Sequence, residues 1–403
     1  MRLAYLLLSP TFGMHQYTAD LANRLVFATS QDSPQVSRQT EVHVITTTTL
    51  PRDRYAPGVN IHTPVTTHGT GLGPGGVRLK GLAEIKTKLA EVAPDVVHLT
   101  GPHIWNIFLM RWLAKQNIPT IHTIHDLDPH RGRRMGFLLH VWNGMVLRLA
   151  DQILVHGQTY QDRLRQQRSP AGKISYTPLL HLFVSHEQIR QLSEMGKEGL
   201  PICYEPFILF FGRLERYKGI GNLLTAYAQM RGDLQSGAAS AASQSGISNK
   251  GTRQQETIPD LVLAGSGHLP TYWAGSLPPG VEVRSGLIDD EAAMELFRRC
   301  SLVVLPYIDA TQSALIAAAY FFHKPVVVTR TGALAEYVED RETGYVVEPD
   351  HPPSLTRALL TMMADPCRLQ EMGNAGRAWY DKRRRQETET LINLYEGWGT
   401  RGP

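Results

Sequence analysis

The sequence predicts an α/β protein built from two consecutive, doubly wound domains. Short apolar segments of strand-like composition alternate with amphipathic helical segments along most of the 403 residues, which is the pattern of a parallel sheet covered by helices on both faces. The alternation stops and starts again near the middle of the chain, and the length suffices for two ordinary domains. With 42% hydrophobic and 19% charged residues, the chain can bury two cores.

The first series of segments fills residues 1–180. Its first strand is expected in "LAYLLLS" and its first helix in "HQYTADLANRLVFATS", where Tyr17, Leu21 and Leu25 share one helical face. Further helices are expected in "RLKGLAEIKTKLAEV", "IWNIFLMRWLAKQ" and a long segment that ends at Leu149. The other strands are predicted in "EVHVITTTT", "VNIHTPV", "DVVHLTG", "PTIHTIHD" and "DQILVHG".

The second series fills residues 207–380 and follows a predicted linker at 181–206, which contains no clear apolar strand. Residues 232–257 are rich in Ser, Gly, Ala and Gln, and we expect them to form a disordered insertion because they bury too little apolar surface to offset their ordering entropy. A final helix is expected at 381–403. The strands are predicted in "FILFFGR", "DLVLAGSG", "VEVRSGL", "LVVLPY", "PVVVT" and "GYVVEP".

Composition excludes several classes of function. The formal net charge of +4 is too small to indicate a nucleic-acid partner. The three cysteines lie far apart without a CxxC or His/Cys cluster, which predicts neither a disulfide framework nor a metal site. No apolar run has the length of a membrane span, and "MRLAYLLLSP" is interpreted as a strand rather than a signal peptide. We therefore expect a cytoplasmic protein, and no motif in the sequence predicts a cofactor.

Two cations occupy one strand-to-helix loop of the second domain. Arg213 follows the strand "FILFFG", and Lys218 opens the next helix. Ligands of parallel sheets bind at the carboxyl ends of the strands, where the planar fork of arginine and the point charge of lysine both suit phosphate oxygens. The alternative is a solvated charge cluster with Glu215 and Arg216. The position after the strand favours a phosphate site.

Two further features of the second domain fit a nucleotide diphosphate. The polar stretch 311–313 is predicted to begin a helix, whose free N–H groups attract anions, although serine and threonine are also ordinary N-caps. Gly265 and Gly267, at the end of the strand "LVLAGSG", are small enough to let a flat ring or a ribose approach the backbone. A diphosphate-binding loop, an anion-binding helix start and a glycine-lined strand end together predict a nucleotide-diphosphate pocket.

These motifs resemble the family 4 retaining nucleotide-sugar glycosyltransferases ("glycosyl transferases group 1"), which have the GT-B fold of two Rossmann-like domains facing across a cleft. "GRLERYKG" matches the family's G-R-x-x-x-x-K-G spacing. The segments "LAGSG", "LPYIDATQSALIAAAYFFHKPVVVTRTGALAEYVEDRETGYVVEP" and "MGNAGR" follow in the family's order. In the first domain, "SPTFGMHQYTADLANRL", "PDVVHLTG" and "TIHDLDPHRG" are similar to the acceptor-domain pattern.

The resemblance implies a hexosyltransferase of polysaccharide or glycolipid biosynthesis. It would move a sugar from a nucleotide diphosphate sugar to a glycan, a lipid-linked acceptor or a small molecule, with retention of configuration and without a metal. In the donor domain, Arg213 and Lys218 would hold the diphosphate, and backbone N–H groups near Ser313 and Ala314 would hold its distal phosphate.

The resemblance also implies roles in the first domain. Gly13 would approach the diphosphate or the sugar, His125 would lie beside the transferred sugar, and Asp126 would support His125. The alternative for His125 is a loop histidine whose hydrogen bonds are satisfied within the protein.

One departure from the family pattern concerns its pair of glutamates, eight positions apart, that touch the sugar and the ribose. Here these positions are Ala310 and Ala318, and Gln312 and Ser313 could supply neutral contacts instead. The loss leaves the donor's base and sugar open. Two alternatives to a glycosyltransferase therefore stay open: a non-catalytic nucleotide-sugar-binding partner subunit, and another GT-B enzyme such as an epimerase or a phosphorylase.

A last segment, "HRGRRMGFLLHVWNGMVLRL", places Arg131, Arg133 and Arg134 before a helix rich in aromatic and aliphatic residues. Basic residues beside such a helix suit an anionic lipid surface. The sequence therefore predicts a peripheral contact with the inner face of a membrane. The alternatives are a helix that only covers the sheet, and arginines that bind an anionic acceptor.

Overall fold

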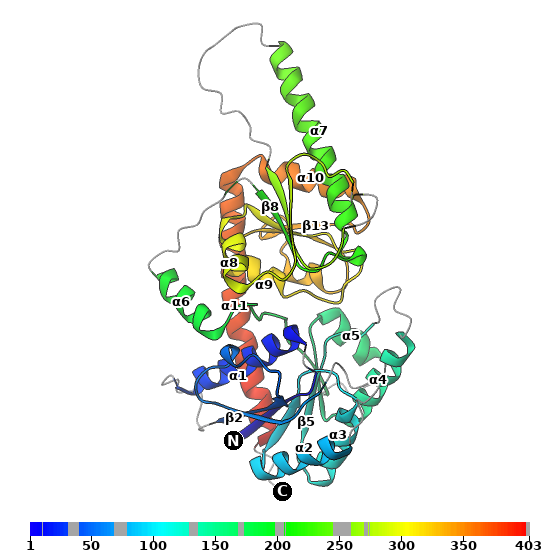
Figure 1. Ribbon diagram of the computed structural model, residues 1–403, viewed down its shortest axis with the longest axis vertical. Coiled ribbons are helices and arrows are strands. Elements are labelled where there is room, and N and C mark those ends of the chain that lie inside the picture. The colour runs from blue at the N-terminus through cyan, green and yellow to red at the C-terminus, as the bar shows by residue number, and fades with distance from the viewer. Residues whose placement is uncertain are drawn as a thin grey trace. The chain divides into compact units, whose positions relative to one another are not determined.

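The computed structural model describes residues 1–9, 11–30, 40–67, 79–128, 136–167, 173–197, 205, 207–244, 259–269, 273 and 275–399 (Figure 1). It divides into two compact units. Unit 1 comprises Met1–Leu200 and Lys382–Pro403, and unit 2 comprises Pro201–Asp381. Each unit contains one parallel sheet with helices around it.

Unit 1 contains a seven-stranded sheet of order β3-β2-β1-β4-β5-β6-β7. Strands β4, β5 and β6 are buried along their whole length, as expected for strands covered on both faces. The helices are α1 (Phe12–Ser30), α2 (Leu79–Val92), α3 (Trp105–Lys115), α4 (Gly136–Leu149), α5 (Gln158–Gln166) and α6 (His186–Lys197). The strands are β1 (Arg2–Leu7), β2 (Glu41–Thr47), β3 (Val59–Val65), β4 (Val96–Leu99), β5 (Thr120–Ile124), β6 (Gln152–Val155) and β7 (Ile174–Tyr176).

Unit 2 contains a six-stranded sheet of order β10-β9-β8-β11-β12-β13. The strands are β8 (Phe207–Phe211), β9 (Asp260–Gly265), β10 (Val281–Ser285), β11 (Leu302–Leu305), β12 (Val326–Thr329) and β13 (Gly344–Val347). The helices are α7 (Ile220–Gln244), α8 (Asp290–Arg299), α9 (Leu315–Phe321) and α10 (Pro352–Met363). Asp289 caps the start of helix α8, because its carboxylate accepts the N–H of Ala292 at 2.8 Å.

Helix α11 (Pro366–Gly399) starts earlier than the final helix expected at 381–403, with Pro366 at its first position. Its first part packs in unit 2, where the ring of Trp379 lies 5.6 Å from that of Tyr320. Its last part packs in unit 1, where the hydroxyl of Tyr395 lies 3.2 Å from that of Tyr5 and 2.8 Å from His98 Nδ1. The helix therefore contributes core residues to both units.

Two other expectations need correction. The predicted linker, 181–206, contains helix α6, whose Leu192 is buried within unit 1. The predicted insertion, 232–257, is helical up to Gln244, because its Ala-rich start extends a helix that is already nucleated. Residues 245–257 lie outside the described residues.

The order of the strands places the candidate ligand-binding edges. In each sheet the chain reverses its direction of winding beside the first strand, between β1 and β4 in unit 1 and between β8 and β11 in unit 2. Ligands of doubly wound sheets bind outside the carboxyl ends of the strands at such a switch point. The candidate ligand-binding residues are therefore those that follow β1, β4 and β5, and those that follow β8, β9 and β11.

Candidate functional site

At the carboxyl edge of unit 2, three loops are held together by backbone contacts. The carbonyl of Tyr217, in the loop after β8, accepts the N–H groups of Ile308 at 2.8 Å and Asp309 at 3.3 Å, in the loop after β11. A Cβ at Gly219 would collide with the carbonyl oxygen of Pro306. The two loops could not approach this closely if residue 219 carried a side chain.

Gly265 and Gly267 have the same kind of role. Both have positive φ, and a Cβ would meet the backbone carbonyl of Gly212 in the first case and that of Leu214 in the second. The loops after β8 and β9 therefore depend on these glycines for their own packing. A contact between either glycine and a donor stays a prediction.

The two predicted phosphate-binding cations lie at this edge, each beside an aromatic ring. Arg213 donates to the hydroxyl of Tyr217 at 3.0 Å and forms an ion pair with Glu215 at 2.9 Å. Lys218 Nζ lies 3.6 Å from the centroid of the Tyr307 ring. The pairing of Arg213 with Glu215 belongs to the alternative interpretation, a solvated charge cluster, so a diphosphate would have to replace that carboxylate at Arg213.

The polar stretch 311–313 does not begin a helix, contrary to the prediction. Helix α9 begins at Leu315, with Ala314 as its N-cap, and the polar residues lie in the preceding loop. The reason is tertiary: the carbonyl of Thr311 accepts the N–H of Ala333 at 2.9 Å, which ties this loop to the loop after β12.

Two side chains of this loop matter for ligand binding. The hydroxyl of Ser313 lies 3.4 Å from that of Tyr307 and 3.4 Å from the N–H of Leu315. The Oε1 atom of Gln312 is buried and has no hydrogen-bond partner among the described residues. A buried acceptor without a donor is costly, so Gln312 offers a place for a hydroxyl or N–H group of a ligand.

The two alanines at the glutamate positions are buried, with 6% of Ala310 and 1% of Ala318 exposed. Because both residues are alanine, no carboxylate is present at either position, and their methyl groups pack inside unit 2. The neutral side chains of Gln312 and Ser313 lie in the same loop as Ala310, as the sequence anticipates.

At the carboxyl edge of unit 1, two imidazoles bridge four consecutive strand ends. His125, after β5, has its Nε2 atom 2.8 Å from the carbonyl oxygen of Thr100, after β4. Its Nδ1 atom lies 3.2 Å from Nε2 of His156, after β6. Nδ1 of His156 lies 2.9 Å from the carbonyl oxygen of Thr177, after β7. Both ring nitrogens of His125 thus face protein atoms, as the alternative interpretation of this residue expects.

The ring of Tyr17, on α1, lies edge-on to both imidazoles, with centroids 4.9 Å from His125 and 5.2 Å from His156. Burial lowers the pKa of His125, an effect that the carbonyl of Thr100 and the carboxylate of Asp126 only partly offset. Burial also holds the pKa of His156 well below its usual value. The sequence analysis missed His156, although its place directly after the strand "QILV" marks it as an edge residue.

The other two predicted residues of unit 1 lie at the same edge. Gly13 is in the first turn of α1, and a Cβ there would meet nothing within 4 Å. The backbone carbonyl of Asp126 accepts the side-chain amide of Asn143, on α4, at 3.0 Å. Gly13 therefore has open space beside it, and Asp126 has a fixed backbone next to His125.

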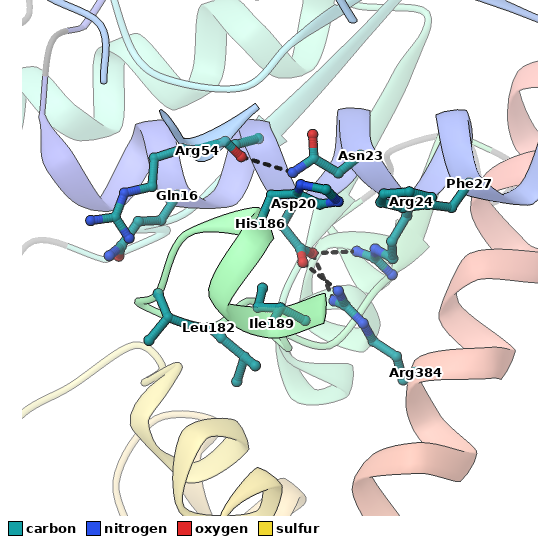
Figure 2. Close-up of a pocket in the computed structure, with 12 residues that line it drawn as sticks. Gln16, Asp20, Asn23, Arg24, Phe27, Arg54, Leu182, His186, Ile189 and Arg384 are labelled. Carbon is teal, nitrogen blue, oxygen red and sulfur yellow. Dashed lines mark hydrogen bonds and ion pairs between the residues drawn. The ribbon is translucent and has the colours of Figure 1, made fainter. Parts of the chain in front are cut away.

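Unit 1 also contains a cavity of about 90 Å³ between α1, α6 and α11 (Figure 2). Asp20 lies between two arginines there, with ion pairs of 3.0 Å to Arg24 and 2.7 Å to Arg384. Burial raises the pKa of Asp20, but the two guanidinium groups outweigh it and hold that pKa below the usual 3.8. Glu387 also pairs with Arg24, at 2.8 Å. Two carboxylates thus face the two arginines, and the cavity has the character of a packing element.

No group of three or more His, Cys, Asp or Glu side chains within the described part of the chain is arranged to hold a metal ion. Among the helices that the structure describes, none combines the length and apolar character needed to cross a bilayer.

Comparisons with known proteins agree with this architecture. Residues 12–179 match the family model of the glycosyl transferase 4-like domain, and residues 205–365 match that of glycosyl transferases group 1. A sucrose-phosphate synthase from Thermosynechococcus elongatus has the same fold, with a TM-score of 0.69 and 19% identity over 98% of this chain and 99% of that one. HepE from Anabaena, in complex with UDP, gives a TM-score of 0.63 and 15% identity over 98% and 100%.

A curated relative is the D-inositol 3-phosphate glycosyltransferase of Segniliparus rotundus, which is 24% identical over 302 residues. The match covers 69% of this chain and 61% of the relative, so the chain spans less than two thirds of that protein's length. Because the two family models together cover most of the chain and the fold agrees with them, the chain belongs to the family 4 glycosyltransferases of the GT-B fold.

Proposed function

We propose that the protein transfers a hexosyl unit from a nucleotide diphosphate sugar to an acceptor, with retention of configuration. The observation that carries the proposal is the edge of unit 2, where Arg213 and Lys218 lie in one strand-to-helix loop. There Gln312 also holds a buried acceptor that finds no partner among the described residues. The UDP bound to HepE supports a nucleotide diphosphate as the ligand of this edge.

Arg213 and Lys218 act on the leaving group in this proposal. Charge builds up on the nucleotide diphosphate as the glycosidic bond breaks, and cations that are already in place stabilise it without reorganisation. Backbone N–H groups near Ser313 and Ala314 bind the distal phosphate. Gln312 takes a hydroxyl of the sugar or the ribose in place of the missing glutamates.

In unit 1, we assign to Gly13, His125 and Asp126 the contacts with the diphosphate and the transferred sugar. Both nitrogens of His125 face protein atoms, so this ring is poorly placed to act as a nucleophile or to accept a proton from the sugar. Its contribution is the shape and charge of the sheet edge. Two cations can neutralise the diphosphate without a metal, and turnover should therefore survive EDTA.

A donor screen tests the proposal. Purified protein is incubated with UDP-, GDP- and ADP-hexoses, and slow hydrolysis is followed by release of the nucleoside diphosphate, with and without EDTA. We expect one donor to be hydrolysed with its anomeric configuration retained. Activity that EDTA abolishes and Mg²⁺ restores would overturn the metal-independent part, and a hydrolysed sugar of inverted configuration would overturn retention.

A second candidate function rests on the buried methyl groups of Ala310 and Ala318. A chain without the two carboxylates could bind a nucleotide sugar as the non-catalytic partner of another transferase. Binding of a donor by calorimetry, without hydrolysis or transfer to any acceptor, would favour this function over the first.

We further propose a cytoplasmic protein whose α3 and α4 contact the inner face of a membrane, where a lipid-linked acceptor would be found. Phe108, Leu138 and Val141 are 47%, 42% and 42% exposed, and Arg111 and Lys115 are exposed on α3. The three arginines of the sequence prediction, 131, 133 and 134, lie outside the described residues.

Co-sedimentation with liposomes that contain anionic lipid tests the membrane contact. We expect binding at low salt that weakens at high salt and in the double variant Leu138→Ser, Val141→Ser. Absence of binding at low salt would overturn the contact, as would binding that the double variant leaves unchanged.

A further inference from the structure

The contacts of His125 and His156 require more protons than two neutral imidazoles carry. The chain of contacts runs from the carbonyl of Thr100 through both rings to the carbonyl of Thr177, and its three distances are 2.8, 3.2 and 2.9 Å. Carbonyl oxygens only accept hydrogen bonds, so each nitrogen that faces one must carry a proton. The nitrogen–nitrogen contact needs a third proton between the rings.

A neutral pair has only two protons. If both face the carbonyls, two nitrogen lone pairs oppose each other across 3.2 Å. If one lies between the rings, a bare nitrogen faces a carbonyl oxygen instead. A single added proton satisfies all three contacts, whereas a second added proton would place two N–H groups against each other.

We propose that His125 and His156 share one added proton as a unit, and that His156 is a positioning residue that fixes the ring and the charge of His125. The protonated pair places one positive charge at the carboxyl edge of the unit 1 sheet. The first step rests on geometry alone. The further step, that this charge assists departure of an anionic nucleotide diphosphate, rests on the proposed function.

The groups around the pair set the pH at which the proton enters. Tyr17, on α1, faces both rings edge-on, and His181, after β7, packs against Tyr17 with centroids 6.0 Å apart. Asp126 favours the charged form of His125, whereas burial opposes it.

More distant groups also act on these imidazoles. His181 and His98 disfavour the charged form of His156, and Asp20, Arg24 and Arg384 act on His181. Burial is the largest effect on both His125 and His156, so the pair should take up its proton below the ordinary pKa of 6.5. An anionic ligand at the edge would raise that pH.

Nuclear magnetic resonance of the full chain, labelled with ¹⁵N-histidine, tests the pair without any donor. We expect the ring nitrogens of His125 and His156 to change together, with one common midpoint below pH 6.5 and uptake of one proton. Separate midpoints for the two residues, or no change of either in this range, would overturn the sharing of a proton.

Two variants extend the test. In His156→Gln the amide can pair with a neutral His125, so we expect the His125 transition to disappear or to fall by at least about one pH unit. His122→Gln is the matched control. His122 is a buried histidine of β5, the strand that ends directly before His125. Its ring nitrogens face one carbonyl, that of Thr123 at 2.9 Å, and the side-chain amide of Asn106 at 3.2 Å, so a neutral ring satisfies both contacts. This control should leave the His125 transition in place. A His125 transition that is the same in His156→Gln as in the wild type would overturn the role of His156.

The pH profile of hydrolysis of the donor from the screen described above tests the further step. We expect kcat to rise as the pair takes up its proton, and His156→Gln to flatten this rise while the control keeps it. A kcat profile that is the same in all three proteins would overturn the catalytic use of the charge but would leave the proton-sharing pair established by resonance. If the protein hydrolyses no donor, the proposed function is contradicted instead. The resonance experiment would still test whether His125 and His156 share a proton.

Discussion

The two units present sheet edges of opposite character. The edge of unit 2 carries permanent charges near solvent, with 59% of the Arg213 side chain exposed. The edge of unit 1 carries buried imidazoles, with 8% of His125 and 1% of His156 exposed. Guanidinium and ammonium groups stay charged at every physiological pH, whereas a buried imidazole gains or loses its charge with its surroundings. Sheets of similar topology thus present a permanent positive charge at the edge of unit 2 and a charge that depends on pH at the edge of unit 1.

The contrast also extends to how each edge is held. The loops of unit 2 approach one another because glycines leave room for backbone contacts. The edge of unit 1 is held by side chains, and unit 1 also contains the buried ion pairs of Asp20. Changes to buried charges should therefore act on the stability of unit 1, and changes to exposed charges should act on ligand binding by unit 2.

The largest expected effect is that of Asp20→Ala, which would leave Arg24 and Arg384 without their shared carboxylate. Removing one partner of a buried ion pair typically costs about 3–5 kcal/mol of unfolding free energy. Chemical denaturation measures it, with Asp53→Ala as the control, because 64% of the Asp53 side chain is exposed. Equal losses of unfolding free energy in the two variants would show that the buried ion pairs of Asp20 do not stabilise unit 1 as inferred.

The same residue predicts an acid dependence. The folded-state pKa of Asp20 lies below its usual 3.8, so its contribution to stability is present above that pH and is lost as the pH falls through the folded-state pKa. The stability of Asp20→Asn should therefore fall less steeply below pH 3.8 than that of the wild type. Parallel acid-unfolding curves for the two proteins would contradict this sign.

Arg213→Ala and Lys218→Ala should weaken donor binding with little loss of stability. A charge-assisted hydrogen bond to phosphate contributes about 1.5–3 kcal/mol, which corresponds to a loss of affinity of about 10- to 150-fold. Calorimetry with UDP and GDP measures it. Arg368→Ala is the control, because Arg368 is an exposed arginine of unit 2 that pairs with Glu371 at 2.9 Å. Unchanged affinity in both variants would show that the diphosphate does not bind at this edge.

A smaller effect is expected for Gln312→Leu, which removes the buried Oε1 atom and keeps a similar volume. One neutral hydrogen bond contributes about 0.5–1.5 kcal/mol, so donor affinity should fall up to about tenfold. Stability should not fall, because this acceptor has no partner in the described part of the protein. Loss of stability with unchanged affinity would show that Gln312 serves the fold rather than a ligand.

The smallest effect is expected for deletion of residues 245–257. This stretch, "SGISNKGTRQQET", contains a single large aliphatic residue, Ile247, and offers little apolar surface to a core. We expect the melting temperature and the donor affinity to stay within experimental error. A drop of several degrees would show that the insertion packs against unit 2.

The sequence predicted most of the architecture because local patterns determine it. The alternation of apolar strands and amphipathic helices gave two parallel sheets, and the loop from Gly212 to Gly219 placed Arg213 and Lys218 at one edge. Both cations lie within a few residues of the same strand, so no long-range contact is needed to bring them together. The same local reasoning misplaced the helix start at 311, because the contact of Thr311 with Ala333 comes from a distant loop.

What the sequence by itself determined is the fold class, the family resemblance and the charge at the edge of unit 2, all of which follow from residues close together in the chain. Tertiary structure alone decided the rest. The backbone approach that requires Gly219 and the shared contacts of His125 and His156 join residues that are far apart in sequence. The burial of the Gln312 acceptor likewise depends on packing. The protonation of a buried group depends on its burial and its hydrogen-bond partners, and only the packed strand ends of unit 1 supply them.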